Sequence, residues 1–139
     1  MKKQKICIIG GGLTGLITAI TLSKLNLQID LISSDIDSNK KSSRTIAISQ
    51  NNRDFLKRLN FHEISKKKFW PCAKMKLYSK NENEESDQLF ELKSNEKQKK
   101  QILYMIENWK LIKYMIENIK KNKIISLETQ KTVSEIIPS

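Results

Sequence analysis

Several residue types that build common functional sites are scarce in this 139-residue chain. The only histidine is His62, which excludes a histidine-based metal cluster. The two cysteines, Cys7 and Cys72, are far apart in the sequence, so they give neither a disulfide framework nor the spacing of a zinc site. We therefore expect no metal, and the free cysteines fit a reducing compartment such as the cytoplasm.

Arginine and aromatic side chains are also few, although the chain is strongly basic. Lysine and arginine together number 26 against 15 acidic residues, which gives a net charge of +11, and only three of the 26 are arginines. Nucleic-acid sites usually interleave arginine and aromatic residues with lysine, so we do not expect nucleic-acid binding. Solvated lysine-rich faces are the favoured interpretation, and peripheral contact with an anionic membrane surface is the functional alternative.

The chain has no long apolar run. The stretch that comes nearest is residues 6–23, which carries no charge. It follows Lys2, Lys3 and Lys5, which is a pattern that signal peptides share. However, it only reaches the lower limit of about 18 residues for a membrane span, contains four glycines and lacks a convincing cleavage site. We interpret it neither as a span nor as a targeting segment.

The same stretch holds the most informative motif of the chain, in which an apolar strand runs into a glycine turn that opens a helix. The spacing is Gly10-x-Gly12-x-x-Gly15. In a dinucleotide-binding βαβ unit, the first glycine permits a tight turn and the second lets the backbone approach a pyrophosphate closely. The third lets the helix lie against its strand. The phosphates then lie at the positive N-terminus of the helix. A glycine turn without a ligand is the less favoured alternative.

The flanks of the glycine turn support this interpretation. Residues 5–9 are a short β-branched run typical of a buried parallel strand, and a second apolar strand, residues 28–32, follows within the length that a βαβ unit allows. Between them, apolar residues recur at helical spacing: Leu13, Leu16, Ile17, Ile20 and Leu25.

The place of the ribose-binding acid is less clear-cut. In the dinucleotide fingerprint an acidic residue at the end of the second strand binds the ribose hydroxyls, and here that place falls on Ser33. Ser34 and Asp35 follow directly, so Asp35 could reach the ribose if the strand ends slightly later. Otherwise Ser33 makes a weaker, neutral hydrogen bond, and Asp35 is a solvated loop residue.

The rest of the chain predicts a mixture of helices and strands. Ser49 could cap a helix over residues 50–59, and Trp70-Pro71 marks a break. The word Tyr104-Met-Ile-Glu-Asn108 recurs at Tyr114–Asn118, and we interpret the first copy as a strand and the second as helical, a coincidence and not a repeat. Strands are expected at residues 75–78, 89–92, 102–106 and 124–127, with a weaker one at 133–137, and a further helix at 108–119.

Three segments, taken together, resemble a known family. They are the glycine turn with Ala19, then the run Arg44-Thr45-Ile46-Ala47-Ile48-Ser49 with a helix that ends at Leu59-Asn60, and then Ile106-Glu107-Asn108 leading into Leu111. Their order and separation resemble the N-terminal third of the FAD-dependent aromatic hydroxylases, and among these the ubiquinone-biosynthesis monooxygenases.

The resemblance implies FAD as the cofactor and assigns roles to particular residues. Arg44 is expected to contact the flavin nucleotide, and its guanidinium could pair bidentately with a phosphate. A surface arginine at a loop end is the alternative interpretation. Asn108 is placed near the cofactor, and Ser33 stands where the family has its ribose-binding acid, with Ser34 and Asp35 beside it. The glycine turn is expected to hold the pyrophosphate through Gly10, Gly12, Leu13, Thr14 and Gly15.

The resemblance also implies a fold: an α/β, Rossmann-like FAD-binding βαβ domain with the start of an inserted substrate-side β-sheet at about residues 70–106. Residues 1–139 would form the N-terminal part of that domain. The family's later Asp-Gly flavin motif, its Gly-Asp segment and most of its substrate domain are absent from these residues. We therefore expect an incomplete chain that is inactive alone.

The parent enzyme, by the same resemblance, uses NAD(P)H and O2 to hydroxylate an aromatic ring, and the expected substrate is a polyprenylated ubiquinone precursor. The flavin carries the difficult chemistry, so no catalytic side chain is assigned. Two alternatives stay open: a non-catalytic nucleotide-binding module or decayed flavoprotein, and an NAD-binding dehydrogenase domain. The ring position, the preferred nicotinamide and the oligomeric state are not predicted.

Overall fold

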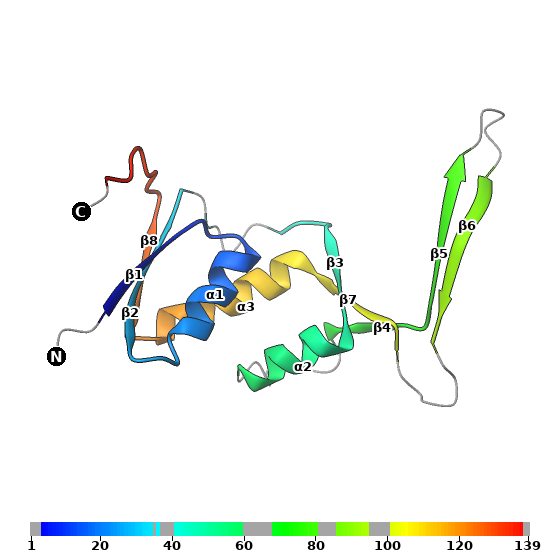
Figure 1. Ribbon diagram of the computed structural model, residues 1–139, viewed down its shortest axis with the longest axis horizontal. Helices are drawn as coiled ribbons and strands as arrows, with labels where there is room; N and C mark the ends of the chain where they lie inside the picture. The colour runs from blue at the N-terminus through cyan, green and yellow to red at the C-terminus, as the bar shows by residue number, and fades with distance from the viewer. Residues whose placement is uncertain are drawn as a thin grey trace. The chain divides into compact units, whose positions relative to one another are not determined.

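The computed structural model describes residues 4–34, 36, 41–59, 68–80, 86–94 and 101–137 (Figure 1). The chain divides into two compact units. The first comprises Met1–Arg44 and Glu107–Ser139, and the second comprises Thr45–Ile106. The glycine turn lies in the first unit, and the range 70–106, in which the sequence predicts a substrate-side sheet, lies in the second.

A parallel sheet forms the first unit. Its strands are β1 (Gln4–Ile9), β2 (Leu27–Ser33) and β8 (Ile125–Thr129), in the order β1-β2-β8. Ile6 lies opposite Ile29, which in turn lies opposite Ile125, and both strand pairs are parallel. Because parallel strands end at the same edge of a sheet, the residues that follow β1, β2 and β8 gather at one edge.

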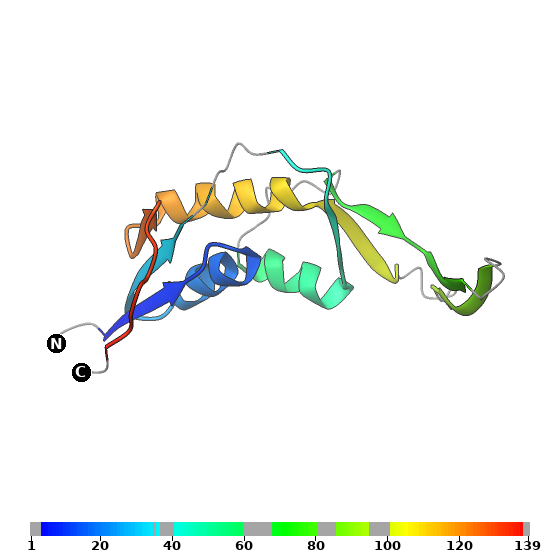
Figure 2. The ribbon, with the colours of Figure 1, turned by 90° about the horizontal axis from the view of Figure 1, so that it is seen from above.

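Two helices pack against this sheet, α1 (Leu13–Leu22) and α3 (Asn108–Lys121), and they lie side by side (Figure 2). Ala19 of α1 is fully buried, and its small side chain allows neighbouring elements to approach the helix closely. The ends of the two helices are joined by a hydrogen bond of 2.8 Å from Asn122 Nδ2 to Ser23 Oγ. The apolar core of the unit also contains Leu16, Ile20, Ile29, Leu31, Leu111, Met115, Ile116 and Ile119.

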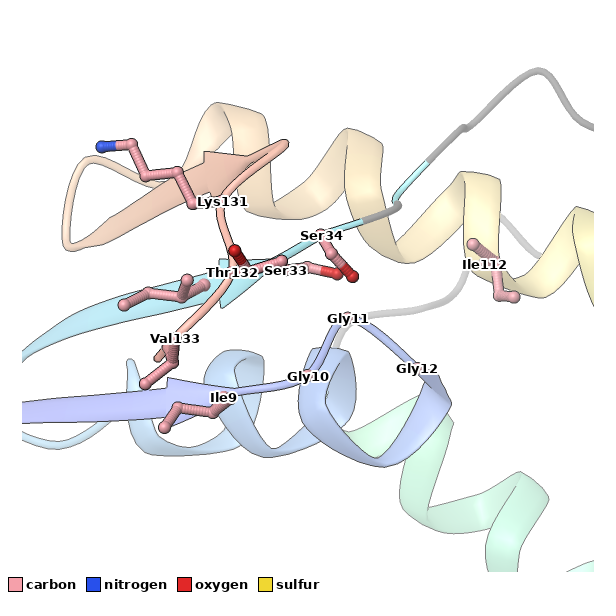
Figure 3. A pocket seen from close by; sticks show the side chains of 11 residues that line it. Ile9, Gly10, Gly11, Gly12, Ser33, Ser34, Ile112, Lys131, Thr132 and Val133 are labelled. Atoms are coloured by element: carbon pink, nitrogen blue, oxygen red, sulfur yellow. The ribbon is translucent and has the colours of Figure 1, made fainter. Parts of the chain in front are cut away.

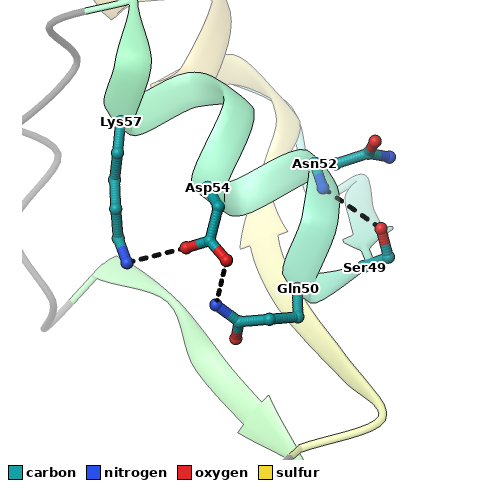
Figure 4. Close-up of polar contacts among 5 residues, drawn as sticks. All are labelled: Ser49, Gln50, Asn52, Asp54 and Lys57. Carbon is teal, nitrogen blue, oxygen red and sulfur yellow. Dashed lines mark hydrogen bonds and ion pairs between the residues drawn. The ribbon is translucent and has the colours of Figure 1, made fainter.

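The second unit contains β3 (Thr45–Ile48), α2 (Gln50–Arg58), β4 (Trp70–Cys72) and β7 (Leu103–Glu107), whose last residue belongs to the first unit. The sheet order is β3-β7-β4. Ser49 caps α2 as predicted, with its hydroxyl accepting a hydrogen bond of 3.2 Å from the backbone N–H of Asn52 (Figure 4). In the same helix, Asp54 accepts from Gln50 and pairs with Lys57.

The strands β5 (Lys74–Lys80) and β6 (Ser86–Lys93) form an antiparallel hairpin in the second unit. Met75 lies opposite Leu92, and Leu77 lies opposite Phe90. These four apolar side chains are exposed. Lys74, Lys76 and Lys93 all pair with the carboxylate of Glu91. The predicted strands at 75–78 and 89–92 are therefore confirmed as the two arms of one hairpin.

Two sequence expectations are wrong. Trp70-Pro71 does not break the structure but lies inside β4, where Pro71 is opposite Tyr104. Since β4 pairs with β7 alone among the described strands, it is an edge strand, in which a proline can face away from the ladder. Residues 133–137 form no strand, and Ile136 and Ile137 are exposed. His62 lies outside the described residues.

Candidate functional site

The glycine turn connects β1 to α1 and is attached to β2. The N–H of Gly10 donates a hydrogen bond of 2.8 Å to the carbonyl oxygen of Ile32, and Gly10 has a φ of 114°, which favours glycine. Gly12 is the N-cap of α1, and its carbonyl accepts the first intrahelical bond, from Leu16. The turn thus takes the strand–turn–helix form that the spacing predicts.

The glycines of this turn differ in what a side chain would meet. A β-carbon on Gly12 would meet no atom within 4 Å, so the backbone faces open space. On Gly15 it would collide with the carbonyl oxygen of Gly10, whereas the strand side chain Ile8 is at 3.7 Å, an ordinary contact. The third glycine is therefore needed first for the turn itself, and only second for packing against the strand as predicted.

Gly11 has a structural role that the sequence does not reveal. A β-carbon there would collide with the side chain of Ile36 and would lie 2.5 Å from Ser33 Oγ. Gly11 therefore lets residues that follow β2 fold down onto the turn. Among the glycines of the turn, only Gly12 has both open space at its β-carbon position and a place at the start of α1.

The N-terminus of α1 can attract an anion. The first N–H groups of any α-helix have no partner inside the helix, and the helix dipole makes this end positive. No side chain caps α1, and its first turn contains no acidic residue. The end of the helix is thus open to a phosphate, although a helix terminus alone does not identify a ligand.

A cavity of about 490 Å³ lies beside this turn (Figure 3). Its volume is within the usual range of small-molecule sites. The wall is formed by the glycine turn, the end of β2 and the segment after β8, with one residue each from β1 and α3. Its lining residues are Ile9, Gly10, Gly11, Gly12, Ile32, Ser33, Ser34, Ile112, Lys131, Thr132 and Val133.

Four of the predicted site residues line this cavity: Gly10, Gly12, Ser33 and Ser34. Ser33 is buried, with 7% of its surface exposed, whereas Ser34 is exposed. Asp35, the alternative ribose ligand, lies outside the described residues. Leu13, Thr14 and Gly15 belong to the first turn of α1 but do not line the cavity.

Arg44 and Asn108 are joined through their backbones and are not among the residues that line the cavity. The backbone N–H of Asn108 donates a hydrogen bond of 2.9 Å to the carbonyl oxygen of Arg44. This bond joins the segment before β3 to the first residue of α3. The Arg44 side chain is exposed, and neither residue lines the cavity. Their predicted contacts with a flavin nucleotide therefore stay predictions.

The segment Lys131–Val133 lines the cavity directly after β8, although no sequence motif pointed to it. Gln130, with a φ of 60°, turns the chain at the end of the strand, and the N–H of Lys131 donates to the carbonyl oxygen of Ser33 at 3.3 Å. The signal was available in principle. A strand was predicted at 124–127, and the structure shows that it is parallel to β2, which places the residues after it at the same sheet edge as the glycine turn.

One ion pair sets the charge at the rim of the cavity. Lys131 Nζ lies 2.8 Å from the carboxylate of Glu128. The hydrogen bond from Lys131, with a further one from Ser126, lowers the pKa of Glu128. Both side chains are partly exposed, so the pair is screened by solvent and contributes little to stability.

The part of the chain that the structure describes contains neither a metal site nor a membrane-spanning helix. Within the ranges that the structure describes, no group of three or more histidine, cysteine, aspartate or glutamate side chains is arranged to hold a metal ion. None of the helices in those ranges has the length and apolar character needed to cross a bilayer.

No protein-family model matches this chain, and no curated protein sequence matches it. Solved structures do. The p-nitrophenol 4-monooxygenase PnpA from Pseudomonas putida DLL-E4 is 20% identical with a TM-score of 0.70, over 98% of this chain and 35% of PnpA. The flavin-dependent monooxygenase PieE, solved with FAD and substrate, is 13% identical with a TM-score of 0.66, over 94% of this chain and 24% of PieE.

A third similar structure carries a different activity in its name. The Diels-Alderase PyrE3 is 10% identical with a TM-score of 0.73, over 99% of this chain and 27% of PyrE3. At these identities the likeness establishes the fold. The predicted fold class, α/β with a parallel sheet and a partial FAD-binding monooxygenase-like architecture, is confirmed. The chain spans about a quarter to a third of the length of these structures.

Proposed function

We propose that this chain is the N-terminal FAD-binding part of a flavin-dependent monooxygenase that hydroxylates an aromatic ring. The observation that carries the proposal is the cavity at the glycine turn, in a fold shared with PnpA and PieE along nearly the whole chain. A fold alone does not fix an activity, so the proposal rests on the turn and the cavity together.

The residues of the cavity fit the nucleotide part of FAD. Gly12 leaves open space where a β-carbon would point, beside a helix end with unpaired N–H groups. These groups would hold the pyrophosphate, and Ser33 and Ser34 would hold the adenosine ribose. FAD, when bound, supplies the redox chemistry that activates O2 for transfer of an oxygen atom to the ring.

The chain's own residues bind and orient in this scheme. The hydrogen bond from Gly10 to Ile32 fixes the turn to β2, so the N–H groups of the turn would be preorganised for the ligand. The apolar side chains Ile9, Ile112 and Val133 limit water around the nucleotide. No side chain of these residues is proposed as an acid, a base or a nucleophile.

Finer parts of the proposal concern the whole enzyme. We propose NAD(P)H as the reductant and a ubiquinone precursor as the substrate, on the resemblance described above. A polyprenylated substrate would require contact with a membrane surface, and the net charge of +11 favours an anionic one. The exposed apolar face of the β5–β6 hairpin fits the start of a substrate-side sheet.

A non-catalytic nucleotide-binding module is the second candidate. The likeness to PyrE3, whose name describes a Diels-Alderase, supports this candidate only in that the fold is not confined to hydroxylation. A module of this kind would bind FAD but would not consume O2 with NAD(P)H.

The first experiment measures FAD binding by the purified complete protein, from flavin absorbance and fluorescence after gel filtration. We expect the folded protein to retain flavin. Folded complete protein that retains none would overturn both the monooxygenase and the non-catalytic module. Oxygen uptake with NAD(P)H and an aromatic substrate, measured on the complete protein, then separates the monooxygenase from the non-catalytic module.

A further inference from the structure

Lysines gather at the end of the first unit that lies opposite the glycine turn. The connection from α1 to β2 contains Lys24 and Leu25, and the connection from α3 to β8 contains Lys120, Lys121 and Lys123 (Figure 1). All five residues are exposed. The glycine turn follows β1, whereas these connections lead into β2 and β8, so they lie at the other edge of the parallel sheet. We call these five residues the lysine surface.

Hydrogen bonds hold the two connections side by side. Asn122 Nδ2 donates to Ser23 Oγ at 2.8 Å, and the backbone N–H of Ile29 donates to the carbonyl oxygen of Ile124 at 3.1 Å. Ser23 is the C-cap of α1 and Asn122 is the C-cap of α3, so both helices end here. The lysine surface is therefore one contiguous face and not two separate clusters of charge.

The lysines of α3 differ from other lysines of the chain in their ionic partners. Lys5 pairs with Asp30, and three lysines of the β5–β6 hairpin share one glutamate. Within the described ranges, no carboxylate forms an ion pair with Lys120, Lys121 or Lys123. The dipole of α3 favours cations in its last turn, but Lys123 lies beyond the helix. The surface thus carries positive charge that can attract an anionic partner.

An exposed leucine stands among these cations. Leu25 has 57% of its surface exposed and directly follows Lys24. At a membrane surface, lysine side chains reach the anionic headgroups while an apolar side chain enters the acyl boundary, so this combination suits a lipid surface. Nucleic-acid sites combine cations with arginine and aromatic side chains, and residues 24–26 and 120–124 contain neither.

We propose that the lysine surface docks the protein on a membrane that contains anionic lipids, with Leu25 entering the interface. The surface lies at the opposite sheet edge from the cavity, so docking does not cover the glycine turn. The inference goes beyond FAD binding. It rests on the proposed function only in that contact with a membrane suits an apolar substrate.

Sedimentation with lipid vesicles tests the inference on the complete protein. Vesicles of phosphatidylcholine alone are compared with vesicles that contain about 30% phosphatidylserine, each at low and at high salt. We expect binding to the anionic vesicles that is weakened by salt and at least about tenfold weaker without phosphatidylserine. Absence of binding to the anionic vesicles, or equal binding to both kinds, overturns the inference.

Two triple variants with the same net charge locate the contact. Replacing Lys120, Lys121 and Lys123 together by glutamine should weaken binding to the anionic vesicles at least about tenfold, because each lysine near the surface adds to the attraction. The control replaces three exposed lysines from other parts of the chain by glutamine: Lys41, Lys68 and Lys80. Equal weakening in both triple variants would show that net charge alone attracts the vesicles, and it overturns the inference.

The apolar part of the contact has its own pair of variants. Leu25→Ser should weaken binding to the anionic vesicles at least about threefold, whereas Leu25→Met, which keeps an apolar side chain, should bind like the native protein. Circular dichroism checks that both variants are folded. Folded Leu25→Ser that binds with unchanged affinity overturns the inference.

The outcome is separable from other partners and from the FAD experiment. Binding of a single-stranded oligonucleotide that is lost in the Lys120, Lys121 and Lys123 variant, without binding of vesicles, would assign the surface to nucleic acid and overturn the inference. Complete protein that retains FAD but ignores anionic vesicles keeps the proposed function and loses this inference. Protein that binds the vesicles through the lysine surface but retains no FAD does the reverse.

Discussion

The carbonyl oxygen of Gly10 occupies the space that a β-carbon on Gly15 would need. The two residues are thus coupled through the turn, because the helix can begin where it does only if residue 15 has no side chain. The sequence spacing is therefore a steric requirement of this turn even before any ligand is considered.

Gly15→Ala should destabilise the first unit. The new methyl group has backbone on one side, which cannot move aside without shifting the turn, so we expect a loss of about 1–3 kcal/mol in the free energy of unfolding. Urea denaturation followed by circular dichroism measures it. An unchanged denaturation midpoint would contradict the steric role of Gly15.

Gly12→Ala separates the fold from the site. The added β-carbon meets nothing within 4 Å, and the φ of −71° suits any residue, so stability should change by less than about 0.5 kcal/mol. The methyl group nevertheless enters the approach to the helix end, and FAD affinity should fall at least about tenfold. A flavin-fluorescence titration measures this affinity, and the denaturation curve is its control. Full FAD affinity in Gly12→Ala would place the pyrophosphate elsewhere.

Ser49→Ala should loosen the start of α2. The hydroxyl of Ser49 accepts from the backbone N–H of Asn52, and loss of such a cap costs about 1 kcal/mol. Hydrogen exchange of the α2 amides should therefore become faster, with Ser49→Asp restoring protection because aspartate caps equally well. Ser79→Ala, on the exposed hairpin, is the control. Equal protection in Ser49→Ala and the native chain would show that the cap is dispensable.

Most helices and strands were predicted because the spacing of apolar residues along each segment indicates its structure. The five-residue word that begins at Tyr104 and again at Tyr114 shows that this spacing matters more than a short word does. The first copy begins in β7 and the second lies in α3, as the surrounding periodicity predicted, since Leu111, Met115 and Ile119 place the second copy on an apolar helix face. The word itself does not determine its structure.

The missed features depend on contacts between segments that are distant in the sequence. Pro71 lies in a strand only because β7 supplies a partner on one side, and Ile36 fills the space beside Gly11 only after β2 is placed. In the same way, Lys131–Val133 reach the cavity through the order of β1, β2 and β8. The glycine turn, Ser33 and Ser34 were thus predictable from the spacing, whereas Lys131–Val133 required the sheet topology.

The pKa of Glu128 provides a test of how Lys131, in the segment after β8, is held beside the cavity. The hydrogen bond from Lys131 is the main cause that lowers the pKa of Glu128 from its ordinary value of 4.5. The pair therefore stabilises the folded chain above about pH 4.5, and this contribution is lost as the pH falls through the lower pKa of the folded state. Lys131→Met should raise the pKa of Glu128, as measured by NMR titration of its carboxyl carbon, while Lys120→Met on α3 should leave it unchanged. An unchanged pKa of Glu128 in Lys131→Met would contradict the ion pair and would leave the hydrogen bond from Ser126 as the cause of the lowered pKa.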